Sequence, residues 1–325
     1  MKNAHAALKT AIASKGVAVP DGTKLTDMPA LVEQISTEPV PTNPRAVFAF
    51  DDATSLVVPN TLVVDFSSAT NINSLFYNNT ALTSITLPAG FGQNATNLGY
   101  CFYYCTALTS LTLPAGFGQN ATNLEYCFYS FPLTSLALPD RFGQNVTNLN
   151  GCFYYCTALT SLALPAGFGQ NATNLEYCFY NCQSLKSLTL PAGFGSNATD
   201  LHNCFSGCKG LVSLTLPAGF GSVATDIRTC FNNCTSLTSL TLPAGFGSNA
   251  TDLHNCFWQC NALKSLTLPA GFGQNAKNIS YCFESDYKLS SLTLPDGFGS
   301  VATDIRRCFN ACVNLVDLHL PEGFG

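Results

Sequence analysis

Sixteen cysteines are the residues of this 325-residue chain whose type and spacing could do chemistry. Many form pairs four residues apart, a spacing that would place both sulfurs on one side of a helical turn. These pairs are Cys101/Cys105, Cys152/Cys156, Cys178/Cys182, Cys204/Cys208, Cys230/Cys234, Cys256/Cys260 and Cys308/Cys312. His202 and His254 lie beside two of them. A closed zinc site needs four converging ligands, and no such set recurs, so we predict no metal site and no cofactor.

Disulfide bonds are the second chemistry that the cysteines could support. Neighbouring strands of a sheet lie about 4.8 Å apart, which is close enough for a bridge between stacked copies of one unit. However, the second cysteine of a pair is Phe131 in one copy and Asp286 in another. A required bridge would not tolerate these replacements, and we therefore expect the cysteines to be small buried side chains.

Other candidate sites have simpler explanations. Asn-x-Thr sequons, formally glycosylation sites, recur at Asn94, Asn120, Asn145, Asn171, Asn197 and Asn249. Their fixed place in each copy, and the loss of one at Lys277, suit a turn cap better than a glycan acceptor. Aspartates and glutamates never pair at a repeated spacing as glycosidase carboxylates would, and no Ser/His/Asp set is visible. We predict that the chain is not an enzyme.

A repeat determines the spacing of all these residues. One proline returns every 26 residues, with a single step of 25, at Pro88, Pro114, Pro139, Pro165, Pro191, Pro217, Pro243, Pro269, Pro295 and Pro321. A period in this range, with recurring Leu and Phe positions, is the signature of a solenoid, in which each unit buries its apolar side against its neighbours.

The unit itself predicts the elements of one coil. Residues 108–113 have the pattern Leu-x-x-Leu-x-Leu, which predicts a short strand with inward leucines that ends at Pro114. Gly116 and Gly118 allow tight turns around a phenylalanine. Asn and Thr then favour local caps before a short helical or 3₁₀ turn that carries Leu124 and Phe128. Stacked copies would form a parallel sheet.

Residues 102–114, Phe-Tyr-Tyr-Cys-Thr-Ala-Leu-Thr-Ser-Leu-Thr-Leu-Pro, resemble the treponemal-type, or BspA-like, leucine-rich repeat, Phe-x-x-Cys-x-x-Leu-x-x-Ile-x-Leu-Pro. The similarity recurs through residues 75 to 321, and it departs in an Ala-Gly-Phe-Gly insertion and a Cys before the Phe. It implies an α/β repeat fold, a leucine-rich-repeat solenoid of about ten 26-residue coils with a parallel β-sheet on one face. Family members are mostly surface proteins that bind proteins or glycans, so the resemblance implies adhesion or recognition without enzyme activity.

We expect three parts along the chain. Residues 1–36 would form a small helical docking module, 37–45 a proline-rich linker, and 46–325 the solenoid, with caps at 46–79 and 314–325. Two short helices bury too little to stand alone. The first segment resembles short modules of bacteriophage tail and fibre proteins, which implies contacts with other virion proteins through residues 1–45.

Charge and hydropathy exclude two classes of partner. Charged residues are only 10% of the chain, and the net charge of -5 is spread without runs. This gives no electrostatic footprint for nucleic acid. The first residues lack the apolar region of a secretory signal, and no stretch is long enough for membrane insertion.

Variation between copies points to a binding surface. The outward strand positions are Ser and Thr in nearly every copy, whereas all twelve tyrosines and Trp258 fall around the Cys-Phe pair. Tyrosine offers a large contact area at low entropy cost. The candidate ligand-binding residues are Tyr100, Tyr103, Tyr104, Tyr126, Tyr129, Tyr154, Tyr155, Tyr177, Tyr180 and Trp258. Rings that merely cover an edge or pack between coils would give the same pattern, and both interpretations stay open.

These observations predict a non-enzymatic recognition protein. We expect a bacteriophage tail-fibre or virion-surface component, made in the host cytoplasm, that binds a glycan or protein of the host cell surface. The alternatives are a structural virion spacer or capsid decoration protein, or an adhesin of a bacterial cell surface. The sequence leaves homo-oligomerisation open.

Overall fold

A computed structural model describes residues 56–57 and 68–325 of the chain. Its regular elements are strands of two or three residues, each preceding the proline of its copy. They are β1 (Leu56–Val57), β2 (Ser84–Thr86), β3 (Ser110–Thr112), β4 (Ser135–Ala137), β5 (Ser161–Ala163), β6 (Ser187–Thr189), β7 (Ser213–Thr215), β8 (Ser239–Thr241), β9 (Ser265–Thr267), β10 (Ser291–Thr293) and β11 (Asp317–His319).

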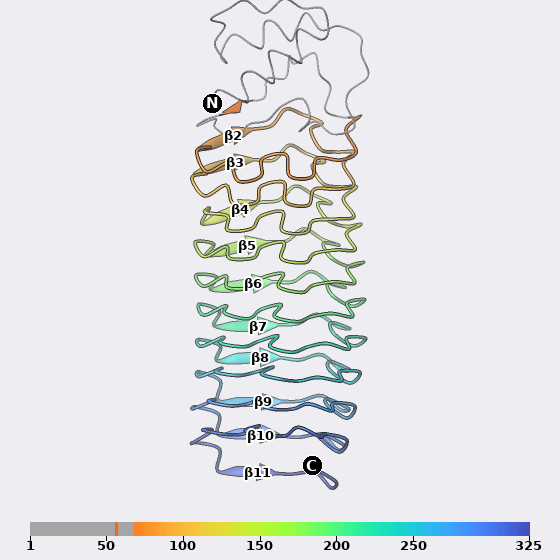
Figure 1. The fold of residues 1–325 in the computed structure, drawn as a ribbon, viewed down its shortest axis with the longest axis vertical. Helices are drawn as coiled ribbons and strands as arrows, with labels where there is room; N and C mark the ends of the chain where they lie inside the picture. Colours follow the sequence, from red (N-terminus) through yellow and green to blue (C-terminus); the bar gives the residue numbers. More distant parts are fainter. Residues whose placement is uncertain (1–55, 58–67) are drawn as a thin grey trace, which may run out of the picture.

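The strands lie one above another along the axis of a column (Figure 1). Paired neighbours are parallel and in register, as in Ser84↔Ser110 and Ser291↔Asp317. The ladders form three groups, β1–β3, β4–β8 and β9–β11. Because each strand comes from the next copy of the repeat, β2 to β11 enclose nine turns of about 26 residues. The predicted parallel solenoid is confirmed.

A second ladder runs down another side of the column. Single parallel bridges join equivalent residues of successive coils, from Asn71↔Asn97 to Asn278↔Asp304. Near them, backbone N–H groups of one coil donate to carbonyl groups of the next: Phe102 N donates to Cys127 O at 2.9 Å. The coil is therefore held to its neighbours on both sides of its core.

The segment around Leu124 and Phe128 forms successive tight turns. Cys127 N donates to Leu124 O at 3.1 Å and Tyr129 N donates to Tyr126 O at 3.2 Å, but Phe128 N donates to Cys152 O of the next coil. Every second N–H is thus taken by a neighbour, and a helix cannot form. The expected turn is therefore present as single i→i+3 turns and not as a helix, and the α/β class is not supported for residues 56–57 and 68–325, which contain no α-helix.

The predicted helices of residues 1–36, the linker at 37–45 and most of the N-terminal cap lie outside the described residues. Within the described ranges no helix could span a membrane. The part of the first coil that is described extends the sheet, since β1 pairs with β2 through Leu56↔Ile85. The division into domains stays a prediction.

Two columns of stacked phenylalanines fill the interior. Phe102 and Phe128 have ring centroids 5.6 Å apart at an interplanar angle of 5°, and Phe117 and Phe142 are 6.1 Å apart at 5°. The columns meet at a tilt, with Phe102 and Phe117 6.3 Å apart at 48°. All four rings are fully buried. A flat ring in each coil therefore packs on the same ring of the next coil.

Gly118 shows why glycine follows one of these phenylalanines. Its φ is +67°, in the left-handed region, and a Cβ there would lie 2.6 Å from the ring of Phe142. Gly116 also has a positive φ, of +81°. The prediction that these two glycines permit tight turns around Phe117 is confirmed.

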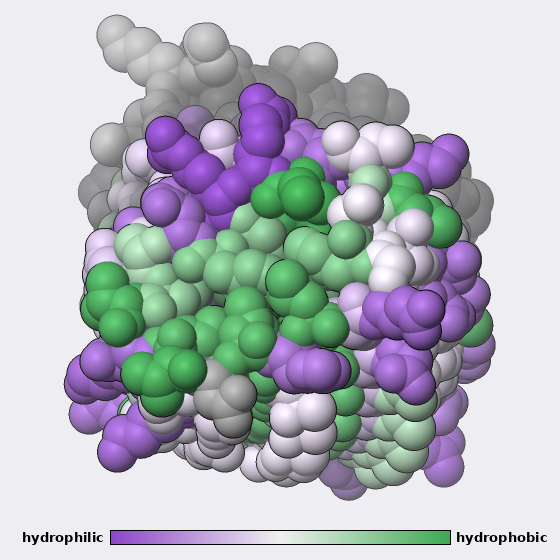
Figure 2. Space-filling view, turned by 90° about the horizontal axis from the view of Figure 1, so that it is seen from below, coloured by the Kyte–Doolittle hydropathy of each residue, from purple (hydrophilic) through white to green (hydrophobic). Residues whose placement is uncertain are grey.

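Apolar side chains gather on the end of the column that follows β11, which Figure 2 shows from below. The side chains of Val313 and Val316 are 72% and 89% exposed there. β11 continues the register of β10. Val313 and Val316 stand at the positions of Thr106 and Thr109, which are also exposed, while Leu315 at a core position is half-buried; the cap at 314–325 stays a prediction.

Candidate recognition surface

The tight turns around the Cys-Phe pair bring nine of the ten candidate residues together. Because equivalent residues stack from coil to coil, the tyrosines form columns, which we name by position in the coil and together call the tyrosine face. The inner column holds Tyr100, Tyr126 and Tyr177; the middle column holds Tyr77, Tyr103, Tyr129, Tyr154 and Tyr180; the outer column holds Tyr104 and Tyr155.

The middle column is a continuous stack. Centroid distances along Tyr77, Tyr103, Tyr129, Tyr154 and Tyr180 are 4.7, 4.2, 5.2 and 4.8 Å, with interplanar angles of 6°, 14°, 13° and 20°. The faces of these rings are therefore occupied by each other. The middle column therefore exposes ring edges and hydroxyl groups.

A glycine interrupts the inner column. Tyr100 and Tyr126 stack at 5.5 Å, but the next coil has Gly151, where a Cβ would collide with the ring of Tyr126. Tyr126 instead meets Tyr154 edge-on at 5.7 Å. Gly151 thus lets the inner and middle columns interlock.

The hydroxyl groups of Tyr100, Tyr103 and Tyr154 remain protonated at neutral pH. Burial, with a hydrogen bond from the hydroxyl to Glu125 Oε1 at 3.0 Å, raises the pKa of Tyr100 to about 12. Burial and the neighbouring Tyr129 raise the pKa of Tyr103 to about 12. Burial also raises the pKa of Tyr154. These groups can act as hydrogen-bond donors and acceptors.

Trp258 is separate from the tyrosines. It occupies the middle-column position of its own coil, but the two coils between it and Tyr180 carry Ser206 and Asn232 there. The structure therefore joins Tyr100 through Tyr180 into one surface and leaves Trp258 apart. The role of all ten residues in binding stays a prediction.

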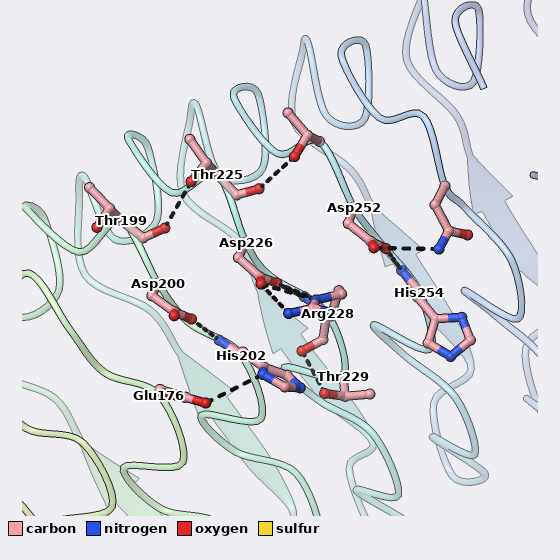
Figure 3. Close-up of polar contacts among 12 residues, drawn as sticks. Glu176, Thr199, Asp200, His202, Thr225, Asp226, Arg228, Thr229, Asp252 and His254 are labelled. Carbon is pink, nitrogen blue, oxygen red and sulfur yellow. Dashed lines mark hydrogen bonds and ion pairs between the residues drawn. The ribbon is translucent and has the colours of Figure 1, made fainter. Parts of the chain in front are cut away.

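A charged stripe lies beside the inner-column positions of the middle coils, which carry Asn203, Thr229 and Asn255 in place of tyrosine (Figure 3). Asp200, Asp226 and Asp252 occupy successive rungs of the bridge ladder. Each Oδ1 accepts the backbone N–H two residues on, from His202 at 2.9 Å, Arg228 at 3.0 Å and His254 at 2.8 Å (Figure 3).

Arg228 and His202 of the stripe have carboxylate partners within the chain. Arg228 Nη2 lies 2.6 Å from Asp226 Oδ2, and His202 Nδ1 lies 3.6 Å from Glu176 Oε1 (Figure 3). The charges of Arg228 and Asp226 therefore offset each other within the chain.

The turn caps are not the residues that sequence reasoning selected. Asn120 Nδ2 donates to Gln93 O of the preceding coil at 2.9 Å, so this asparagine joins coils and does not cap its own turn. The local cap is Asn123, whose Oδ1 accepts Glu125 N–H at 3.0 Å. An Asn or Asp at that place in every copy was the available signal.

The cysteines form part of the core. All sixteen are unpaired and fifteen are buried. The second cysteine of a pair donates its thiol hydrogen to a phenylalanine carbonyl of the preceding coil, as Cys105 does to Phe76 O at 3.0 Å and Cys182 to Phe153 O at 3.1 Å. Burial raises the pKa of Cys101 and Cys204 well above the ordinary value.

Such buried thiols are poor nucleophiles and poor metal ligands. Over residues 56–57 and 68–325, no group of three or more His, Cys, Asp or Glu side chains could hold a metal ion.

The fold and this surface define a leucine-rich-repeat solenoid. The model of the BspA type leucine rich repeat region matches residues 69–196 and 175–316, which is well over half of the chain. The protein belongs to this family. No curated protein matches it in sequence.

Several solved structures are similar at low identity. A leucine-rich repeat protein from Bacteroides ovatus is 18% identical, over 80% of this chain and 77% of that one, with a TM-score of 0.31. The T. pallidum leucine rich repeat protein is 20% identical over 57% and 78%, with a TM-score of 0.39. One from Eubacterium ventriosum is 17% identical over 94% and 85%, with a TM-score of 0.38. Similarity at this level carries no argument about ligands.

Proposed function

We propose that this chain is a non-enzymatic recognition protein that binds a surface glycan or protein through the tyrosine face. The observation that carries the proposal is the concentration of partly exposed tyrosines, from Tyr77 to Tyr180, on one side of consecutive coils. Tyrosine is enriched at protein interfaces because it combines apolar area with a hydroxyl group and loses little entropy.

The strand face supports the same assignment by contrast. In β5 to β10 the Ser and the Thr or Ala of each strand are exposed and the central leucine is buried. A surface that repeats without change discriminates little between ligands. It suits a scaffold that displays the tyrosine face.

For the biological setting, we propose attachment of a virion to its host, with residues 1–45 as the docking segment. A bacterial cell surface is the second candidate, because BspA-type repeat proteins are often cell-surface proteins. In either setting the solenoid would display the same binding surface.

The exposed outer column offers the cleanest test of the binding surface. Tyr104 and Tyr155 are 42% and 39% exposed, and they contact the middle column at its side, Tyr104 beside Tyr103 at 6.3 Å and Tyr155 on Tyr154 at 5.0 Å. We expect Tyr104→Ser with Tyr155→Ser to weaken attachment of the full chain to intact bacterial cells and to a printed glycan array. A buried interface tyrosine contributes about 2 kcal/mol, so the loss should be roughly 30-fold for each ring that is engaged.

The matched control places larger neutral side chains on the strand face, as Thr112→Gln with Thr215→Gln. Both threonines are exposed. Attachment should survive this change. If the threonine variant loses attachment and the tyrosine variant keeps it, the binding face is the strand face; if neither matters, the protein is a spacer.

A further inference from the structure

The outer column lacks one ring at its middle coil. Positions 104, 130 and 155 have the same backbone geometry, with φ of 57°, 52° and 58°. Each also donates its N–H to the next coil, from Tyr104 to Tyr129 O at 3.0 Å, Ser130 to Tyr154 O at 2.7 Å and Tyr155 to Tyr180 O at 2.8 Å. Ser130 therefore occupies the position at which a third ring would continue the outer column. Successive positions of the column are separated by the spacing of a β-ladder, about 4.8 Å.

Aromatic rings surround this place on three sides. Tyr104 and Tyr155 flank Tyr129, with centroids 6.2 and 6.5 Å from it and tilts of 35° and 31°. The faces of Tyr129 are taken by Tyr103 at 4.2 Å and Tyr154 at 5.2 Å. Tyr155 itself stacks on Tyr154, at 5.0 Å and 28°, so the accessible ring surface here belongs to Tyr104 and to the part of Tyr155 that Tyr154 leaves uncovered. Removing one ring from such a column leaves room for one planar group.

The charged side chains of the tyrosine face are negative and lie beside its inner column. Between residues 75 and 182 the tyrosine face carries Glu125 and Glu176 and neither lysine nor arginine. Both carboxylates act on Tyr126, whose ring centroid lies 6.0 Å from that of Tyr129. Aromatic faces are themselves electron-rich and attract cations. A planar cation is the group that fits both the shape and the charge.

We propose that the place above Ser130 takes the guanidinium group of an arginine from a protein partner, held between Tyr104 and Tyr155. This assignment rests on the proposed function, because it names the ligand chemistry of the same face. A guanidinium is flat, weakly hydrated and stacks on aromatic faces, whereas the ammonium of lysine is a compact, strongly hydrated point charge. A neutral sugar ring lacks the charge.

The test uses the full chain with ¹³C-labelled tyrosine and follows the ring resonances of Tyr104 and Tyr155. The probes are the capped tripeptides Gly-Arg-Gly, Gly-Lys-Gly and Gly-citrulline-Gly, and maltose. Citrulline keeps the plane of arginine without its charge. We expect the arginine peptide to shift both resonances in a saturable way, the lysine peptide to bind more weakly, and citrulline and maltose to leave the resonances unchanged.

Two substitutions at Ser130 separate loss of the site from loss of the fold. Ser130→Tyr supplies the missing ring, which the backbone already accepts at Tyr104 and Tyr155. It should weaken binding of the arginine peptide at least about fivefold. Ser130→Gly leaves the place open, as Gly207 does three coils further at a positive φ of 75°, and should bind like the parent.

Equal binding of citrulline or maltose, full affinity in Ser130→Tyr, or no saturable shift with the arginine peptide would each overturn the assignment. Other outcomes separate failure of the arginine assignment from failure of the proposed function. If Tyr104→Ser with Tyr155→Ser abolishes attachment to cells while the arginine peptide never binds, the face is right and its ligand is not arginine. If attachment persists in that variant, the face itself is wrong.

Discussion

Asp286 is the residue that departs furthest from its column. Where other copies have a cysteine that donates a thiol hydrogen to a phenylalanine carbonyl, Asp286 is fully buried. Its Oδ1 accepts Cys260 N–H at 2.7 Å, and its Oδ2 has no hydrogen-bond partner among the described residues. Burial raises the pKa of this carboxyl well above the ordinary value. Burial therefore favours the neutral form of this carboxyl over the charged one, compared with an exposed aspartate.

We predict that Asp286→Cys stabilises the protein, by about 1–3 kcal/mol at neutral pH. The pKa of Asp286 is higher in the folded chain than the value of about 3.9 expected when unfolded. Its contribution is thus fully present below about pH 4 and is lost as pH rises toward the folded pKa. The gain from Asp286→Cys should grow with pH in the same window. Urea unfolding of variant and parent at pH 5 and pH 8 measures this gain. Equal free energies of unfolding for the two proteins at pH 8 would contradict a raised pKa for Asp286 in the folded chain.

At the scale of the coil, the two glycines around Phe117 differ in how close a side chain would come to its neighbours. A Cβ on Gly118 would lie 2.6 Å from Phe142, whereas a Cβ on Gly116 would have its nearest neighbour at 3.5 Å. Both residues have positive φ, so both alanine variants carry a similar backbone strain of about 1–2 kcal/mol.

We therefore predict that Gly118→Ala lowers the free energy of unfolding by at least about 1–3 kcal/mol more than Gly116→Ala, because only the first must displace a stacked ring. Chemical denaturation of the two variants compares them directly. Similar losses would mean that the phenylalanine column yields easily and that backbone strain alone requires glycine.

The coil also shows what sequence could and could not predict. The strands were predictable because alternating leucines and a terminal proline are local signals. The turn from Leu124 to Phe128 was predictable, but its failure to continue as a helix was not, because the hydrogen bond from Phe128 N to Cys152 O joins it to the next coil. The tyrosines were predictable as candidate binding residues because this residue type is concentrated in one short window of the repeat. Their arrangement in three columns, of which the middle one is a continuous stack, and the separation of Trp258 required the register between coils.

For the whole molecule, the decisive property is that each coil touches only its neighbours, so that stability is a sum of coils and interfaces. Equivalent residues repeat without offset, as in Ser187↔Ser213 and Ser213↔Ser239. Phe205, Phe231 and Phe257 are likewise spaced by 5.5 Å at each step. Removing residues 213–238 would join Val212 to Ser239 and bring Phe205 onto Phe257 in the same geometry.

We predict that this 26-residue deletion folds cooperatively, with a denaturant m-value lower by about a tenth, because m scales with the surface exposed on unfolding. Binding by the tyrosine face should be unchanged, since Tyr77 to Tyr180 precede the deletion. Removing residues 213–225 instead places Asp226 where the strand begins and should prevent folding. Circular dichroism and urea titration of both chains decide the matter: if the whole-coil deletion unfolds as readily as the half-coil deletion, the stability of the column resides in contacts that extend beyond neighbouring coils.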